Sequence, residues 1–150
     1  MKEQNYNEAI KYFKKALSLN DKSIILNSFL AQAYQMNKNF NCSIKYYEAA
    51  EALDPESLLI KFQKANIFFM MKEYDAALDI LNHLDKLIPK ESPIHVLLGR
   101  IYKIKKEYAK AQHHFDVAMD LNSKDSNMIK GLMEKLRDEE DDENSMNITD

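Results

Sequence analysis

The chain has 150 residues, of which 45% are hydrophobic and 30% are charged, a composition that can bury a core and excludes a disordered polymer. Only 2 Gly and 3 Pro are present, too few for the turns of a β-sandwich of this length, so we expect a mostly helical chain. The single cysteine excludes a disulfide framework and a Cys-based zinc site. No apolar stretch is long enough to predict a membrane span.

Acidic residues are concentrated near the C-terminus. Seven acidic residues and no basic residue follow Arg137, so the preceding body has a small positive excess although the net charge is −3. The bases of this body are scattered lysines rather than an arginine-rich cluster, which is typical of solvated helix surfaces and predicts no nucleic-acid partner. Since the N-terminus also lacks a basic-then-apolar secretory signal, we expect no membrane partner and a location in the cytosol or nucleus.

A period of 34 residues runs through the chain without insertion or deletion. Small residues recur at this spacing at Ala9, Ser43, Ala77 and Ala111, and again at Ala31, Ala65 and Gly99. Aromatic residues follow the same spacing at Tyr6, Phe40, Tyr74 and Tyr108. This is the period and pattern of the tetratricopeptide repeat, in which two antiparallel helices, A and B, cross closely at small residues.

The period divides the chain into one partial repeat and three complete repeats. Residues 1–23 are predicted to be helix B of a partial repeat, and three complete repeats cover 24–57, 58–91 and 92–125. The A helices are expected near 24–36, 58–70 and 92–104, and the B helices near 5–19, 40–53, 74–87 and 108–121. Ser92 is expected to cap the third A helix, with Pro93 at its first position. The predicted fold class is all-α, a right-handed tetratricopeptide superhelix.

The two ends of the array are expected to differ. Residues 126–137 have one apolar stripe and are predicted to form a capping helix, followed by an acidic disordered tail over 138–150. The helix near 5–19 would leave an apolar face without a stacking partner. Two interpretations are open: the chain is the C-terminal piece of a longer array, or this incomplete repeat self-associates with another copy.

The sequence offers no pattern for catalysis, metal binding or a cofactor. Gly99 and Gly131 do not form a phosphate-binding loop, and no His-x-x-x-His or Cys-x-x-Cys pair is present. His95 is isolated in the sequence, and Cys42 has no recognisable base. We therefore expect no catalytic residues, no metal, no cofactor and no enzyme activity.

A tetratricopeptide array offers a concave face that its A helices line. The predicted peptide-binding residues on this face are Gln32, Phe62, Asn66, Phe69, Arg100 and Lys103. The two phenylalanines would anchor apolar side chains, the amides would bond to a peptide backbone, and Arg100 would take a carboxylate. No acidic residue occupies the lining positions. The alternative is that some of these side chains only contact the next helix.

Local sequence carries a more specific resemblance. The runs LIPKES at 87–92, LGRIYK at 98–103 and AMDLN at 118–122 resemble the last repeats of the tetratricopeptide subunit of the anaphase-promoting complex, the cell division cycle protein 27 homologue. The resemblance implies a non-catalytic scaffold of a nuclear and cytoplasmic ubiquitin ligase that controls the cell cycle. Its partners would be protein subunits of the complex and peptide tails ending in Ile-Arg. The alternative is a tetratricopeptide adaptor of another multiprotein complex.

Overall fold

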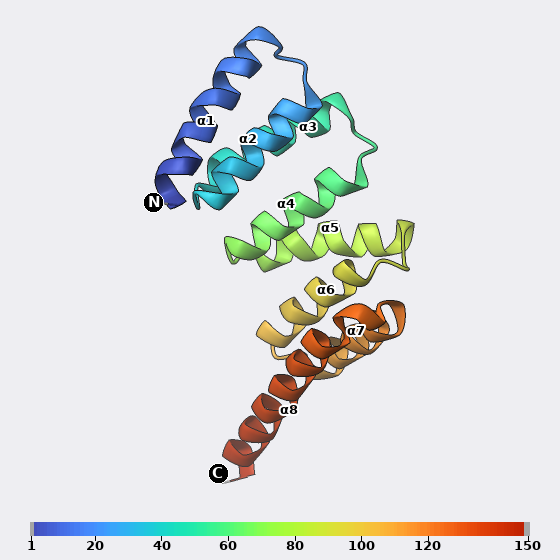
Figure 1. Cartoon of the computed structure of the whole chain (residues 1–150). Helices are drawn as coiled ribbons and strands as arrows, with labels where there is room; N and C mark the ends of the chain where they lie inside the picture. The colour runs from blue at the N-terminus through green and yellow to red at the C-terminus, as the bar shows by residue number, and fades with distance from the viewer. Residues whose placement is uncertain (1, 149–150) are drawn as a thin grey trace. The chain divides into compact units, whose positions relative to one another are not determined.

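The computed structural model describes residues 2–148, apart from the side chains of residues 2–4 and 123, and every regular element in this range is helical (Figure 1). The elements are α1 (Lys2–Leu19), α2 (Ile24–Met36), α3 (Phe40–Leu53), α4 (Leu58–Met70), α5 (Tyr74–Leu87), α6 (Ser92–Ile104), α7 (Tyr108–Leu121), a 3₁₀ turn η1 (Ser123–Asp125) and α8 (Ser126–Ile148). The predicted all-α class is confirmed.

The A helices α2, α4 and α6 and the B helices α3, α5 and α7 begin and end where the 34-residue period predicts. The starts of α2, α3 and α4 are capped by short polar side chains. The Ser23 hydroxyl accepts the backbone N–H of Leu26 at 3.1 Å, and Asn39 accepts the N–H of Cys42 at 3.3 Å. Each bond satisfies one donor that a helix start leaves without a partner. Helix α1 differs slightly, since it already includes Lys2 rather than starting near residue 5.

Every turn from an A helix to a B helix contains a lysine in the left-handed conformation. Lys38, Lys72 and Lys106 have φ values of 59°, 62° and 62°. In the first turn the N–H of Lys38 bonds to the carbonyl of Gln35, and the N–H of Asn39 bonds to that of Tyr34. The other two turns repeat this pair of bonds, which closes the C-terminus of a helix and usually employs glycine. The turns are therefore built without glycine, at a conformational cost.

We expect Lys38→Gly to stabilise the chain by about 0.5–1 kcal/mol, because glycine adopts a positive φ without the clash that a Cβ introduces. Lys11→Gly is the matched control, since Lys11 is an exposed lysine within α1. There glycine should destabilise by about 0.5–1 kcal/mol. Urea unfolding followed by circular dichroism measures both changes. Destabilisation of similar size by both variants would contradict the assigned role of the turn.

The described chain forms two compact units, which meet in the sequence between Ile80 and Leu81, within α5. In the N-terminal unit Ala31 and Ala50 are fully buried and pack with Tyr47, Ile60 and Ile67. The absence of large side chains at both alanines lets helices approach closely. Such packing also brings the buried Ser43 hydroxyl to the carbonyl of Ala31, to which it donates a hydrogen bond at 2.7 Å.

In the C-terminal unit the core forms around Phe115, which is fully buried together with Ala111 and Ala118 of α7 and with Ile129 and Leu136 of α8. These two α8 residues are seven apart and therefore lie on the same side of the helix. Helix α8 thus covers the apolar face of the last complete repeat, as a terminal capping element does.

Ser92 does not have the predicted capping role. It is the first residue of α6, Glu91 occupies the cap position, and no side chain caps this helix. The buried Ser92 hydroxyl instead donates to the carbonyl of Ala118 at 3.2 Å, near the end of α7. Because Ser92 packs against α7, its hydroxyl bonds to the Ala118 carbonyl instead of capping a backbone N–H of its own helix.

The predicted disordered tail also differs from the structure. Helix α8 does not end near residue 137 but continues to Ile148, and residues 149–150 lie outside the described range. Two lysines of the preceding repeat contact this acidic segment of α8. Lys103 contacts Glu139 at 3.1 Å and Lys106 contacts Glu143 at 2.7 Å. Because the two acids are four residues apart, a helix presents both on one side.

Candidate functional site

The first candidate surface lies on the A helices of the N-terminal unit. We call it the A-helix face. Its residues are Ile25, Ser28, Gln32, Gln35 and Met36 of α2 and Leu59, Phe62, Asn66, Phe69 and Met70 of α4. The first and last residues of each set are separated by about three helical turns and point the same way. The two sets adjoin, since the Gln35 amide donates to the Met70 sulfur at 3.8 Å.

Large apolar side chains are exposed at both ends of this face. Ile25 and Leu59 are 65% and 67% exposed, and Met36 and Met70 are about half exposed. The same unit also exposes Tyr12, Leu19, Phe29 and Leu53, whereas Leu30, Ile60 and Ile67 are buried in its clusters. Repeated exposure at equivalent positions of two helices is the pattern of a surface that contacts another molecule.

The predicted residues of the N-terminal unit lie between these apolar ends. Gln32 is exposed, whereas Phe62 and Asn66 are half-buried. Phe69 is half-buried too, and its ring packs edge-on against Tyr74 of α5, with 5.9 Å between ring centroids. Phe69 therefore contacts the next helix, which was the alternative interpretation for the lining residues. Phe62 remains the candidate aromatic anchor at the centre of the face.

The remaining two predicted residues, Arg100 and Lys103, lie on α6 in the C-terminal unit. Arg100 is exposed. The Lys103 side chain is only 19% exposed and forms an ion pair with Glu139 of α8. No acidic residue occupies a lining position, but Glu139 of α8 reaches Lys103 from outside the A helices. Glu139 was missed because the helix that carries it was expected to have ended.

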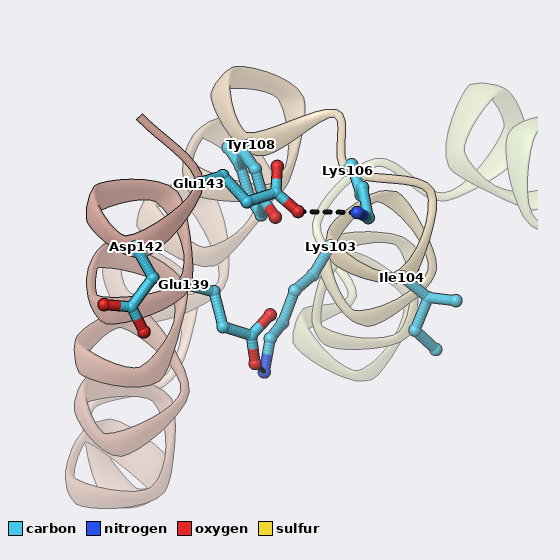
Figure 2. A pocket seen from close by; sticks show the side chains of 7 residues that line it. All are labelled: Lys103, Ile104, Lys106, Tyr108, Glu139, Asp142 and Glu143. Carbon is cyan, nitrogen blue, oxygen red and sulfur yellow. Dashed lines mark ion pairs between the residues drawn. The ribbon is translucent and has the colours of Figure 1, made fainter. Parts of the chain in front are cut away.

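This ion pair belongs to a pocket of about 330 Å³, lined by Lys103, Ile104, Lys106, Tyr108, Glu139, Asp142 and Glu143. One wall is the end of α6 and the start of α7, and the other is the acidic part of α8 (Figure 2). Glu139 and Glu143 extend toward the lysines, while Asp142 points away from them (Figure 2). We call Lys103, Lys106 and Tyr108 the basic wall.

Each lysine of the pocket is paired with one carboxylate of α8, Lys103 with Glu139 and Lys106 with Glu143. Hydrogen bonding to Lys106 lowers the pKa of Glu143, and a further bond from Tyr108 acts in the same direction. The same carboxylate raises the pKa of Lys106. Partial desolvation is the main cause that raises the pKa of Tyr108, with the Glu143 bond adding to it. A carboxylate is therefore the complementary ligand of the basic wall.

A second pocket of about 300 Å³ lies in the N-terminal unit and is lined by Glu48, Glu51, Ala52, Pro55 and Lys64. Lys64 forms an ion pair with Glu51 at 3.1 Å across α3 and α4. The pocket contains no aromatic residue and only one base, which Glu51 already holds. It offers no arrangement for a specific ligand beyond this bridge.

A pair of histidines, the buried His95 and the half-buried His114, lies within the C-terminal unit, although His95 is isolated in the sequence. The His95 Nε2 atom contacts the Pro89 carbonyl at 2.8 Å and Asp85 Oδ1 at 3.2 Å. Its Nδ1 atom faces His114 Nδ1 at 3.1 Å. His114 also stacks on Tyr102, with 5.6 Å between ring centroids. No sequence motif joins these residues, because three helices bring them together.

The bonding partners fix the tautomers of the pair. His95 Nε2 faces two acceptors and must carry a proton, so its Nδ1 accepts from His114 Nδ1–H in the neutral state. Burial lowers the pKa of His114 to about 4, and the nearby His95 and His113 act in the same direction. Both rings are therefore used for packing and hydrogen bonding.

The described residues contain no group of three or more His, Cys, Asp or Glu side chains that could hold a metal ion. Cys42, the only cysteine, is half-buried and unpaired with sulfur. Between residues 2 and 148, no helix combines the length and hydrophobicity that crossing a bilayer requires. The surfaces with recognisable chemistry are thus the A-helix face and the basic wall.

Comparisons with known proteins agree with this geometry. A Tetratricopeptide repeat family model matches residues 1–23 and 92–125. The structure is similar to residues 41 to the end of MamA from Desulfovibrio magneticus RS-1, with a TM-score of 0.80 and 17% identity over 93% of this chain and 78% of that one. It is also similar to pilF of Pseudomonas aeruginosa, with a TM-score of 0.77 and 22% identity over 93% of this chain and 63% of that one.

No curated protein sequence matches the chain significantly. At these identities the two solved structures are informative about the fold alone. None of these matches supports the narrower resemblance to the anaphase-promoting complex subunit, which stays a prediction from the sequence. The chain has the fold of tetratricopeptide-repeat proteins and carries that repeat at both matched segments.

Proposed function

We propose that the chain is a non-catalytic adaptor that binds a peptide segment of a partner protein on its A-helix face. The observation that carries the proposal is the exposure of Ile25, Met36, Leu59 and Met70 at equivalent positions of α2 and α4. Apolar side chains at these positions suit the anchors of an extended peptide or a short helix. Gln32 and Asn66 lie between them and offer amide groups to a peptide backbone.

Membership of the anaphase-promoting complex is the narrower form of this proposal. Local sequence, including the runs at 87–92, 98–103 and 118–122, favours it, and its nuclear and cytoplasmic location depends on the same resemblance. The adaptor of another complex fits the fold equally well. A peptide ending in Ile-Arg distinguishes the two, because only the narrower form expects it to bind more tightly than the same peptide without its final arginine.

The A-helix face can be tested by making the same leucine-to-alanine change at one site within the face and one site outside it. Peptides selected from a random 12-residue display library against the full chain serve as the probe. We expect Leu59→Ala to weaken their binding about tenfold, since a buried apolar anchor contributes about 1–2 kcal/mol. Leu19→Ala is the control, because Leu19 is 85% exposed but lies on α1, outside the face. Fluorescence anisotropy measures both affinities.

Phe62→Ala should also weaken binding, because Phe62 is the central aromatic residue of the face. Circular dichroism and urea unfolding verify that each variant remains folded. Since Leu59 is exposed, its truncation should leave stability within about 0.5 kcal/mol. Equal binding by wild type, Leu59→Ala and Phe62→Ala, or failure to select any peptide, would contradict the proposal.

A further inference from the structure

The acidic half of α8 is held more weakly than the half that precedes it. Ile129 and Leu136 are buried in the core of the C-terminal unit, but no described residue after Leu136 is buried. Its contacts with the basic wall include a hydrogen bond between Tyr108 and Glu143 and two ion pairs, Lys103–Glu139 with side chains 19% and 52% exposed and Lys106–Glu143 with side chains 69% and 35% exposed. Each ion pair has one partner that is at least half exposed to solvent, and such pairs contribute little stability, so this part of α8 can separate from the wall without disturbing the core.

The basic wall is a suitable site for a different acidic helix. Lys103 is at position 12 of its A helix, equivalent to Gln35 and Phe69 on the A-helix face. Ile104 is 46% exposed beside it and repeats the exposure of Met36 and Met70. The basic wall thus offers two ammonium groups and a phenol, with the apolar Ile104 beside them. A helix with two carboxylates four residues apart would match these groups, as Glu139 and Glu143 do.

We propose that the basic wall of Lys103, Lys106 and Tyr108 binds an acidic helical segment of a partner protein, and that α8 occupies this site through Glu139 and Glu143 until the partner displaces it. The inference deepens the proposed adaptor function by naming the charge of one partner segment. In this proposal the acidic part of α8 competes with the partner segment for the basic wall. The pKa changes of Lys106 and Glu143 agree with the contact, which the geometry alone defines.

The test uses the full chain and a labelled peptide with the sequence of residues 137–148 as the acidic probe. The double variant Glu139→Gln/Glu143→Gln removes the internal carboxylates while keeping similar side-chain shapes. We expect it to bind the probe about fivefold more tightly than wild type, the gain from removing two exposed ion pairs. Adding Lys103→Gln and Lys106→Gln should abolish the gain. Anisotropy titrations at two salt concentrations provide the measurement.

The matched control is Asp138→Asn/Glu140→Gln. It changes the net charge of α8 by the same amount, but neither residue lines the pocket. This control should bind the probe as wild type does. An equal gain in both double variants would show a general charge effect and overturn the proposal, as would no gain in Glu139→Gln/Glu143→Gln.

The outcome is separable from the test of the A-helix face. Leu59 and Phe62 lie in the N-terminal unit, whereas the basic wall lies in the C-terminal unit. Loss of the Leu59→Ala effect with a preserved gain in Glu139→Gln/Glu143→Gln would reject the A-helix face as the peptide site and retain the basic wall. The opposite pair of results would reject only the internal competition.

Discussion

Replacement of Gly99 by alanine is expected to destabilise the C-terminal unit by about 2 kcal/mol, because the added methyl group enters space that the Phe115 ring already fills. A Cβ atom at Gly99 would lie 2.6 Å from Phe115 Cε1 and 2.7 Å from Cδ1. The ring is fully buried and packs in a cluster with residues of α6, α7 and α8. Urea unfolding of the full chain, with hydrogen exchange of the α7 amides, measures the loss.

Two further variants identify the cause. Gly131→Ala is the same substitution within α8, where a Cβ meets no atom within 4 Å. It should stabilise the unit by about 0.5–1 kcal/mol, since alanine favours a helix over glycine. In a Phe115→Leu background, Gly99→Ala should cost clearly less than in wild type. An unchanged cost in that background would mean that Phe115 is not what requires glycine.

Acidification is expected to reduce the stability of the C-terminal unit through His114. Its pKa in the folded chain is about 4, below the ordinary 6.5, mainly because of burial. The unfolded chain therefore takes up a proton first as the pH falls. The contribution is fully present above pH 6.5 and is lost progressively as the pH falls toward 4. Because the ring is only partly buried, we expect a loss of about 1.5 kcal/mol.

The variant His114→Gln should flatten this dependence, since glutamine can donate to His95 but does not titrate. The quantity to compare is the difference in unfolding free energy between pH 7 and pH 4.5 for each protein. Gln112→Ala on the same helix is the control, and it should change stability by a similar amount at both pH values. Identical pH differences for wild type and His114→Gln would refute the linkage.

The helices could be predicted from the sequence because one regular pattern specifies them. Small residues such as Ala31 and Ala50 recur every 34 residues where helices cross, and all six helices of the complete repeats have the predicted limits. The left-handed turns were not predicted, because lysine stands where glycine is the usual signal. Hydrogen bonds of the whole turn, which no single residue reveals, impose this conformation on Lys38, Lys72 and Lys106.

The candidate sites were less predictable, because they depend on contacts between helices. Equivalent repeat positions correctly located Ile25, Met36, Leu59 and Met70 on the A helices, but not how Phe69 would meet Tyr74. The acidic segment was expected to be disordered from its composition alone. Its spacing was the available signal, since Glu139 and Glu143 lie one helical turn apart, but the lysines they contact are more than 30 residues earlier. The histidine pair required the same long-range information.

The hydrogen-bonded turns at Lys38, Lys72 and Lys106 have a consequence for how the length of such a chain can vary. They fix the rotation of each B helix relative to the A helix that precedes it, and so fix which side chains of the two helices face each other. Duplication or deletion of one whole 34-residue module would leave every later side chain facing its original neighbours, since each helix pair meets only adjacent ones. One extra residue inside a helix would instead rotate all following side chains of that helix by about 100°. Insertion or deletion of entire modules should therefore be tolerated, whereas insertion of a single residue within a helix should not.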